Sequence, residues 1–199
     1  MNIFFLINWV THHLKTITEI LLVVFILFVL KNYLTPRKKL KLFPELIPYP
    51  MHYKNVRAVL SAEDWKNIAK IIYKKSKFQC DICANKGRLE CHEIWDFDEN
   101  NHYQRLVGLT SLCPLCHQVK HIGFAKKRGL WKETIQHMAT VNNISIGQAK
   151  KNVYYAELLV KKRNKEYFLD LTYLNQFSFL PRKYTNYENN SCQSIRGNY

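Results

Sequence analysis

Two pairs of cysteines constrain the fold of this chain more than any other feature of its sequence. Both pairs have C-x2-C spacing, and their members are Cys80, Cys83, Cys113 and Cys116. Four thiolates from two such pairs bind zinc tetrahedrally, and the spacing is typical of a metal site in a reducing compartment. The alternative, a pair of disulfides, requires an oxidising compartment. We therefore expect a structural Zn²⁺ that joins two distant segments of the chain.

The segments around these cysteines predict an α+β domain. The first cysteine pair precedes strand-like residues, and the second pair leads directly into a helix. A zinc knuckle, then a β-hairpin, then a second knuckle followed by a helix is the order of elements in a treble clef, here with flanking helices. Residues 61–76 indicate a helix that Ser61 caps. A second helix is expected at 133–141, a third behind the capping box 145–148, and a strand at 166–174.

The N-terminal residues 1–34 differ from the rest of the chain. Ile20–Leu30 is continuously apolar, and a helix over 17–34 approaches the shortest length that spans a bilayer. No Lys or Arg precedes Lys15 and no small-residue cleavage site follows, which argues against a removable signal peptide. The segment therefore predicts a transmembrane helix that anchors the protein, although a buried or interfacial helix is the alternative for so short an apolar run.

Positive charge is distributed unevenly around this segment. Only Lys15 precedes the apolar run Ile20–Leu30, whereas five cations follow it: Lys31, Arg37, Lys38, Lys39 and Lys41. By the positive-inside rule the C-terminal domain lies in the cytoplasm, which agrees with reduced cysteines. Several prolines make residues 35–60 an extended basic linker. We expect the folded domain at 61–174 and a polar, flexible tail at 175–199.

The whole chain is strongly basic, with a net charge of +15 over 199 residues. This balance indicates a polyanionic partner, either nucleic acid or an anionic membrane face, although a basic surface also serves solubility. A basic cluster near the second cysteine pair suits phosphate groups, and its members are Lys120, Lys126, Lys127, Arg128 and Lys132. We expect DNA as the partner, and no protein partner follows from the sequence.

Four further side chains indicate a second site. His92 and Glu93 belong to the strand-like segment between the cysteine pairs, and His117 and His121 are four residues apart, so that a helix places them on one face. If the cysteines hold zinc, these groups remain free for chemistry. We expect them to converge, because the hairpin of a treble clef faces the start of its last helix.

In these residues the chain resembles the HNH endonuclease family, through the stretches QCDIC, LECHEIW and VGLTSLCPLCHQVKH. The resemblance covers residues 50–174. It implies a ββα-metal domain that hydrolyses phosphodiester bonds in DNA with low sequence specificity. It also implies that His92 and His117 bind a catalytic metal, that Glu93 stands at the general-base position, and that His121 is an added ligand as in the colicin-type nucleases.

Two positions depart from the family pattern. The base position holds Glu93 instead of His, unless the register shifts by one and His92 is the base, and Gly108 replaces a frequent Asn. Glu93 as a fourth ligand is a further alternative. Three imidazoles suit Zn²⁺ or Ni²⁺, and the catalytic metal is expected to be one of Mg²⁺, Mn²⁺, Ni²⁺ or Zn²⁺. The alternative function is an inactive treble-clef module that binds nucleic acid at the membrane.

Overall fold

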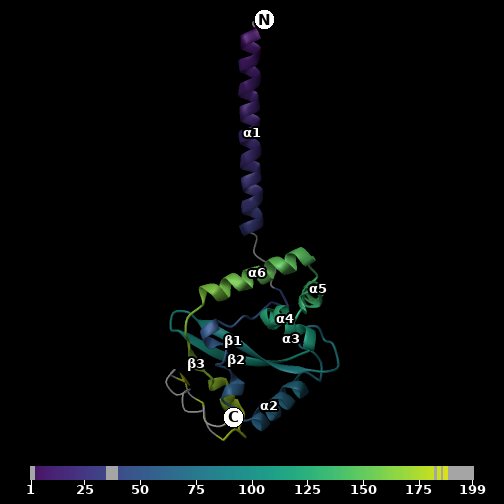
Figure 1. The fold of residues 1–199 in the computed structure, drawn as a ribbon, viewed down its shortest axis with the longest axis vertical. Coiled ribbons are helices and arrows are strands. Elements are labelled where there is room, and N and C mark those ends of the chain that lie inside the picture. Colours follow the sequence, from purple (N-terminus) through teal and green to yellow (C-terminus); the bar gives the residue numbers. More distant parts are fainter. Residues whose placement is uncertain (1–2, 35–39, 182, 185, 188–199) are drawn as a thin grey trace. The chain divides into compact units, whose positions relative to one another are not determined.

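A computed structural model describes residues 3–34, 40–181, 183–184 and 186–187 (Figure 1). The chain divides into two compact units, Met1–Leu40 and Lys41–Tyr199. The boundary lies within the predicted linker 35–60, so most of that segment belongs to the second unit.

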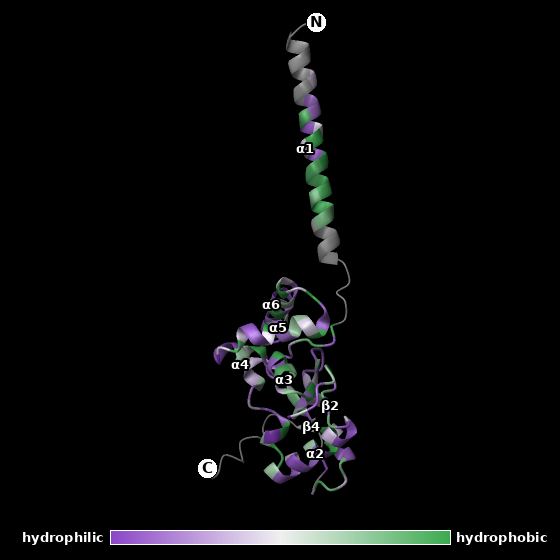
Figure 2. Cartoon of the chain, turned by 90° about the vertical axis from the view of Figure 1, so that its right-hand side faces the viewer, coloured by the Kyte–Doolittle hydropathy of each residue, from purple (hydrophilic) through white to green (hydrophobic). Residues whose placement is uncertain are grey.

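The first unit contains one long helix, α1 (Ile3–Leu34), whose described residues are mostly hydrophobic (Figure 2). Its described apolar side chains are exposed. Among the described residues no helix is both long enough and apolar enough to cross a membrane. The transmembrane helix predicted at 17–34 is therefore not found. Its described apolar run ends at Phe28 and is preceded by Glu19 and Lys15, while the side chains of 29–34 lie outside the described part.

The second unit is an α+β domain, as predicted. Within the described residues four strands form one sheet in the order β1-β2-β3-β4. The long antiparallel pair is β1 (Glu90–Asp98) with β2 (Tyr103–Leu112); β3 (Phe168–Asp170) runs parallel to β2, and β4 (Asn186–Tyr187) pairs with β3. The turn between β1 and β2 forms because Oδ1 of Asp98 accepts the amide hydrogens of Asn100 and Asn101.

One face of the sheet is covered by α2 (Ala62–Lys75). Ser61 caps this helix by accepting the amide hydrogen of Asp64 at 3.0 Å, as predicted. Ile68 and Ile72 lie on its buried stripe and join a core cluster with Cys91 of β1. This apolar cluster holds the hairpin from one side.

The opposite face of the hairpin meets α3 (Pro114–Lys120). Three further helices follow: α4 (Ile122–Lys127), α5 (Trp131–Asn142) and α6 (Ile146–Lys162). The last two confirm the predicted helices, and the capping box of Ser145 and Gln148 is present. The ribbon shows α3 and α4 close to the hairpin (Figure 1).

The predicted strand at 166–174 is too long. β3 ends at Asp170, whose Oδ1 accepts hydrogen bonds from the amide of Thr172 at 2.9 Å and its hydroxyl at 2.7 Å. These bonds start the 3-10 helix η3 (Thr172–Gln176). The described part of the predicted tail also packs on the domain, since Tyr184 is buried in the core cluster; residues 188–199 lie outside the described range.

The segment before α2 is folded, not extended as predicted. Leu42, Met51 and Val56 are fully buried, and two short 3-10 helices, η1 (Tyr49–Met51) and η2 (Val56–Ala58), interrupt it. Prolines restrict the backbone but leave its apolar side chains free to pack.

Buried Asn142 at the end of α5 fixes the start of this segment. Its Nδ2 donates to Leu42 O at 2.7 Å, and its Oδ1 accepts from Leu42 N at 3.0 Å. Asn142→Ala should lower the free energy of unfolding by about 2–4 kcal/mol, because it leaves buried backbone groups unpaired. Urea titration of the full chain measures this. Asn152→Ala, which removes one exposed bond, should cost less than about 1 kcal/mol; equal losses would contradict the explanation.

Candidate metal centres

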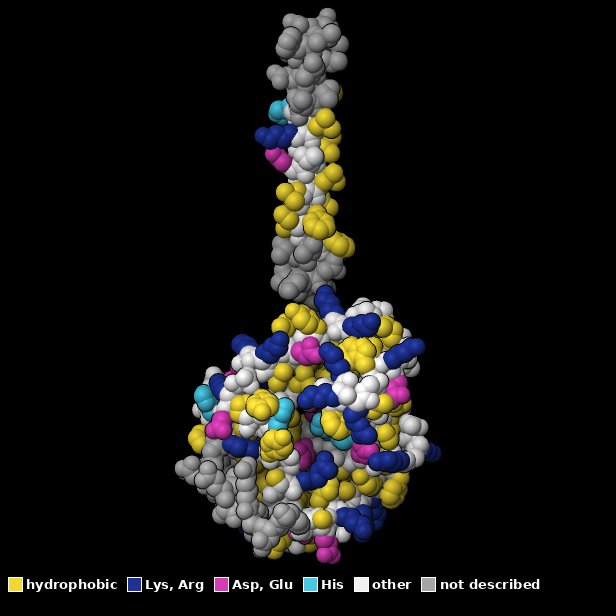
Figure 3. All heavy atoms as spheres, viewed as in Figure 1, with side chains coloured by type: hydrophobic (Ala, Val, Ile, Leu, Met, Phe, Trp, Pro, Cys, Tyr) yellow, Lys and Arg dark blue, Asp and Glu magenta, His cyan; other side chains and the backbone are white. Residues whose placement is uncertain are grey.

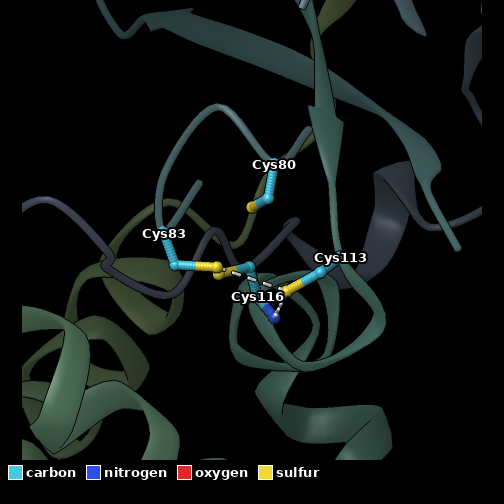
Figure 4. Close-up of side chains that lie close together, drawn as sticks. All are labelled: Cys80, Cys83, Cys113 and Cys116. Atoms are coloured by element: carbon cyan, nitrogen blue, oxygen red, sulfur yellow. Dashed lines mark hydrogen bonds between the residues drawn. The ribbon is translucent and has the colours of Figure 1, made fainter. Parts of the chain in front are cut away.

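The four predicted cysteines lie together. Their sulfur atoms are all within 4.8 Å of one another, and Sγ of Cys83 is 3.6 Å from Sγ of Cys113 (Figure 4). Three of the four side chains are buried, and Cys83 is half-buried. The cluster can bind a structural metal such as zinc, whose preferred ligand set is four thiolates at this proximity.

Backbone hydrogen bonds shape the first knuckle and attach it to the hairpin. Ala84 donates to Cys80 O at 2.9 Å and adopts a positive φ of 58°. Asp81 N donates to Ser111 O at 2.9 Å, while Oδ2 of Asp81 accepts from Ser111 N and Thr110 Oγ1, each at 2.8 Å. These bonds bring the first cysteine pair to the end of β2, immediately before the second pair.

The electrostatics of the cluster favour a cation. A hydrogen bond with the Cys116 thiol, followed by backbone amide donors, lowers the pKa of Cys80 to about 4. The pKa of Cys116 is raised, chiefly by its hydrogen bond to Cys80, and burial raises the pKa of Cys83 to about 11. The lowered pKa of Cys80 favours negative charge on the cluster. A bound metal ion would displace the thiol protons and stabilise all four sulfurs as thiolates.

A fifth side chain, which the sequence did not indicate, touches this cluster. Nε2 of His137 in α5 lies 3.2 Å from Sγ of Cys116. Burial lowers the pKa of His137, which favours its neutral form. A neutral imidazole that donates to a ligating sulfur orients that ligand from outside the first coordination shell.

The three predicted histidines form a second cluster. Ring nitrogens of His92, His117 and His121 lie within 4.8 Å of one another. The ring centroids are 5.2 Å apart for His92 and His117, 4.9 Å for His92 and His121, and 4.6 Å for His117 and His121. His92 comes from β1 and His117 from α3, whereas His121 caps the C-terminal end of α3. The hairpin and the helix thus bring together three of the four groups expected to converge, and Glu93 is the exception.

Two carboxylates hold two of these rings. Nε2 of His92 is 2.9 Å from Oε2 of Glu45, and Nδ1 of His117 contacts Oε2 of Glu90. Lys120 also binds Glu45, with 2.5 Å between Nζ and Oε1. A carboxylate on one ring nitrogen fixes the tautomer and leaves the other nitrogen to a metal, which is the usual outer-shell arrangement of ligating histidines.

His117 and His121 favour their neutral forms. Burial first, and then the neighbouring His92 and His117, lower the pKa of His121 to about 3. The pKa of His117 is also lowered, first by burial and then by His92. Burial raises the pKa of Glu45. Its hydrogen bond with His92 and the charge of Lys120 outweigh burial, so the pKa of Glu45 lies below its usual value. Neutral imidazole is the form that binds a metal.

Glu93 lies beside this cluster but is not a member of it. Neighbouring strand residues point to opposite faces, so Glu93 projects away from the face of His92. Its Oε1 accepts the amide hydrogen of Val56 at 3.0 Å, and its Oε2 accepts the indole hydrogen of Trp95 at 3.2 Å. Burial raises its pKa, partly offset by these donors. Because β1 is the edge strand among the described residues, His92 and Glu93 still line the same cleft.

This cleft has a volume of about 730 Å³ and contains all three histidines. Arg57 lines it from η2, is exposed, and has no ion pair among the described residues. Of the predicted basic cluster, Lys127 and Arg128 line the cleft. Lys120 instead neutralises Glu45, Lys126 lies 3.9 Å from Glu157, and Lys132 is exposed outside the cleft lining.

Comparisons with models of protein families, with curated proteins and with solved structures found no match for this chain. The resemblance to HNH endonucleases therefore remains a prediction from the motifs. Three residues that the sequence did not indicate lie at the proposed site in the structure, namely Glu45, Arg57 and Glu90.

Proposed function

We propose that the second unit is a metal-dependent endonuclease of the HNH type, built on a treble clef, which hydrolyses phosphodiester bonds in DNA. The observation that carries this proposal is the three-histidine cluster, whose ring nitrogens lie within 4.8 Å of one another on a hairpin and the helix that follows it. A thiolate cluster beside it would stabilise the fold. The site's carboxylate partners and neutral imidazoles support metal binding.

The residues fit a divalent cation. His92, His117 and His121 would hold Zn²⁺, Ni²⁺, Mn²⁺ or Mg²⁺ and leave coordination positions open for water and phosphate. When bound, the cation supplies charge neutralisation at the phosphate and lowers the pKa of a bound water. Glu45 and Glu90 keep two rings in the ligating tautomer.

Other residues would act on the substrate. Glu93 would accept the proton of the attacking water, since two donors, Val56 N and the Trp95 indole, fix its carboxylate at the wall of the cleft. Arg57 would bind a phosphate oxygen, because its exposed side chain lines the cleft and forms no salt bridge among the described residues, while its charge also acts on Glu93. Lys127 and Arg128 would contact flanking phosphates, which gives affinity without sequence readout.

The experiment is plasmid nicking by the full-length protein with Mg²⁺, Mn²⁺, Ni²⁺ or Zn²⁺ added separately. We expect nicking with at least one metal and none by His117→Ala. His102→Ala is the matched control, because His102 lies in the β1–β2 turn outside the cluster, and it should cut like the native chain. If the native protein retards DNA but never cuts it with any metal, the activity is refuted and the inactive binding module is favoured.

A further inference from the structure

We propose that the histidine cleft takes single-stranded nucleic acid, with unpaired bases stacked on exposed aromatic rings at its rim. This inference rests on the proposed function, because it names the substrate class of the same cleft. It starts from two rings that packing does not explain. Tyr53 is 86% exposed and Phe124 is 62% exposed, and both line the cleft.

The two rings come from separate segments. Tyr53 follows η1, and Phe124 lies in α4. Two half-buried rings, Trp65 and Trp95, line the same cleft. Large aromatic side chains usually bury most of their surface. Trp65 and Trp95 also pack against the core cluster. It is therefore the two exposed rings, Tyr53 and Phe124, that suggest a ligand with flat apolar faces.

Cations accompany these rings. The guanidinium of Arg128 lies over Phe124 at 5.4 Å from the ring centroid, and that of Arg57 lies over Trp65 at 5.6 Å. On the face of the second unit drawn in Figure 3, Lys and Arg side chains alternate with hydrophobic ones. Ring and cation together match a nucleotide, because the ring stacks on the base and the cation neutralises the adjoining phosphate.

The choice of a single strand follows from where the base faces lie. In a duplex the bases are stacked on one another and expose only their edges in the grooves. An unpaired strand exposes base faces, and base–aromatic stacking is the main affinity source of single-strand-binding proteins. Rings as exposed as Tyr53 and Phe124 contribute to binding only if base faces reach them.

The experiment measures binding separately from cleavage. Full-length protein without added divalent metal is titrated into a fluorescein-labelled oligonucleotide, either single-stranded or annealed to its complement, and anisotropy gives Kd at one fixed salt concentration. We expect the single strand to bind about tenfold more tightly. Tyr53→Ala and Phe124→Ala should each weaken single-strand binding about tenfold and change duplex binding by less than about twofold.

Two controls make the result specific. Tyr154→Ala removes a ring that is 61% exposed on α6, outside the cleft, and should change neither Kd. Phe124→Trp should retain tight binding, because it keeps a stacking surface. Equal Kd values for both oligonucleotides, or equal effects of Phe124→Ala and Tyr154→Ala, would overturn the inference even if the protein nicks plasmids. Single-strand preference without metal-dependent nicking would support it while refuting the nuclease.

Discussion

Full-length protein carrying Cys80→Ser is expected to lose zinc and the cooperative unfolding transition of its second unit. Cys80 is 2% exposed and its sulfur lies in the four-cysteine cluster, which joins the first knuckle to β2 and α3. Structural zinc in small domains contributes roughly 10–16 kcal/mol, while whole domains are stable by about 5–15 kcal/mol. Losing one ligand of four therefore removes stability comparable to that of the fold.

Circular dichroism during heating, with zinc content measured by atomic emission, checks this expectation. Cys91→Ser is the matched control. Cys91 is also buried, but it lies in the apolar cluster under α2, and burial raises its thiol pKa to about 12. That variant should keep the zinc and lose only about 1–2 kcal/mol for the buried hydroxyl. A folded, zinc-bearing Cys80→Ser protein would show that the cluster does not hold the domain together.

His92→Ala and Glu93→Gln should both reduce cleavage, the first by lowering metal affinity and the second by lowering kcat. Removing His92 takes one of three imidazoles from the metal, so the metal affinity of this cluster should fall by at least about tenfold and excess metal should partly restore the rate. Removing the charge of Glu93 should leave metal affinity within about threefold and lower kcat by about 100-fold, the usual contribution of a general base. Isothermal titration with Ni²⁺ and single-turnover cleavage separate the two.

The stability effect of Glu93→Gln needs its own control. Its carboxylate accepts hydrogen bonds from Val56 N and the Trp95 indole, so the amide should cost about 1–3 kcal/mol. Cleavage must therefore be measured below the unfolding transition. Glu99→Gln makes the same change at a residue paired with Arg163, outside the cleft, and should cut normally. If Glu93→Gln keeps the native kcat, the general base is His92, as in the alternative register in which the family pattern is shifted by one residue.

Much of the candidate site could be predicted because many of its ligand residues lie close to one another in the sequence. The C-x2-C spacing places two sulfurs on one knuckle whatever surrounds it, and His117 directly follows Cys116 on the same helix. His121 illustrates a limit. It is the C-cap of α3 with φ −100° and ψ 42°, so the helix stops before it, yet its ring still lies 4.6 Å from that of His117. The face it occupies was predictable, but the break in the helix was not.

The residues that sequence reasoning missed act across long separations. Glu45 lies in a segment that prolines suggested was extended, and it reaches His92 only because Asn142 and Lys120 hold that segment against α5 and α3. Arg57 enters the cleft from a 3-10 turn without a distinctive pattern. Such contacts depend on tertiary packing, which periodicity and spacing do not encode.

Cys116 and His117 are adjacent on α3, and this adjacency links the proposed occupancies of the two metal centres. A metal held by the thiolates would stabilise the first turn of α3, and His117, which belongs to the histidine cluster, directly follows Cys116 in that helix. Metal should therefore load in a fixed sequence, thiolates first and imidazoles second, and a titration should show positive coupling between the sites. A chelator would then inactivate the protein in two stages, first by removing the ion from the histidine cluster and then by removing the ion from the thiolates.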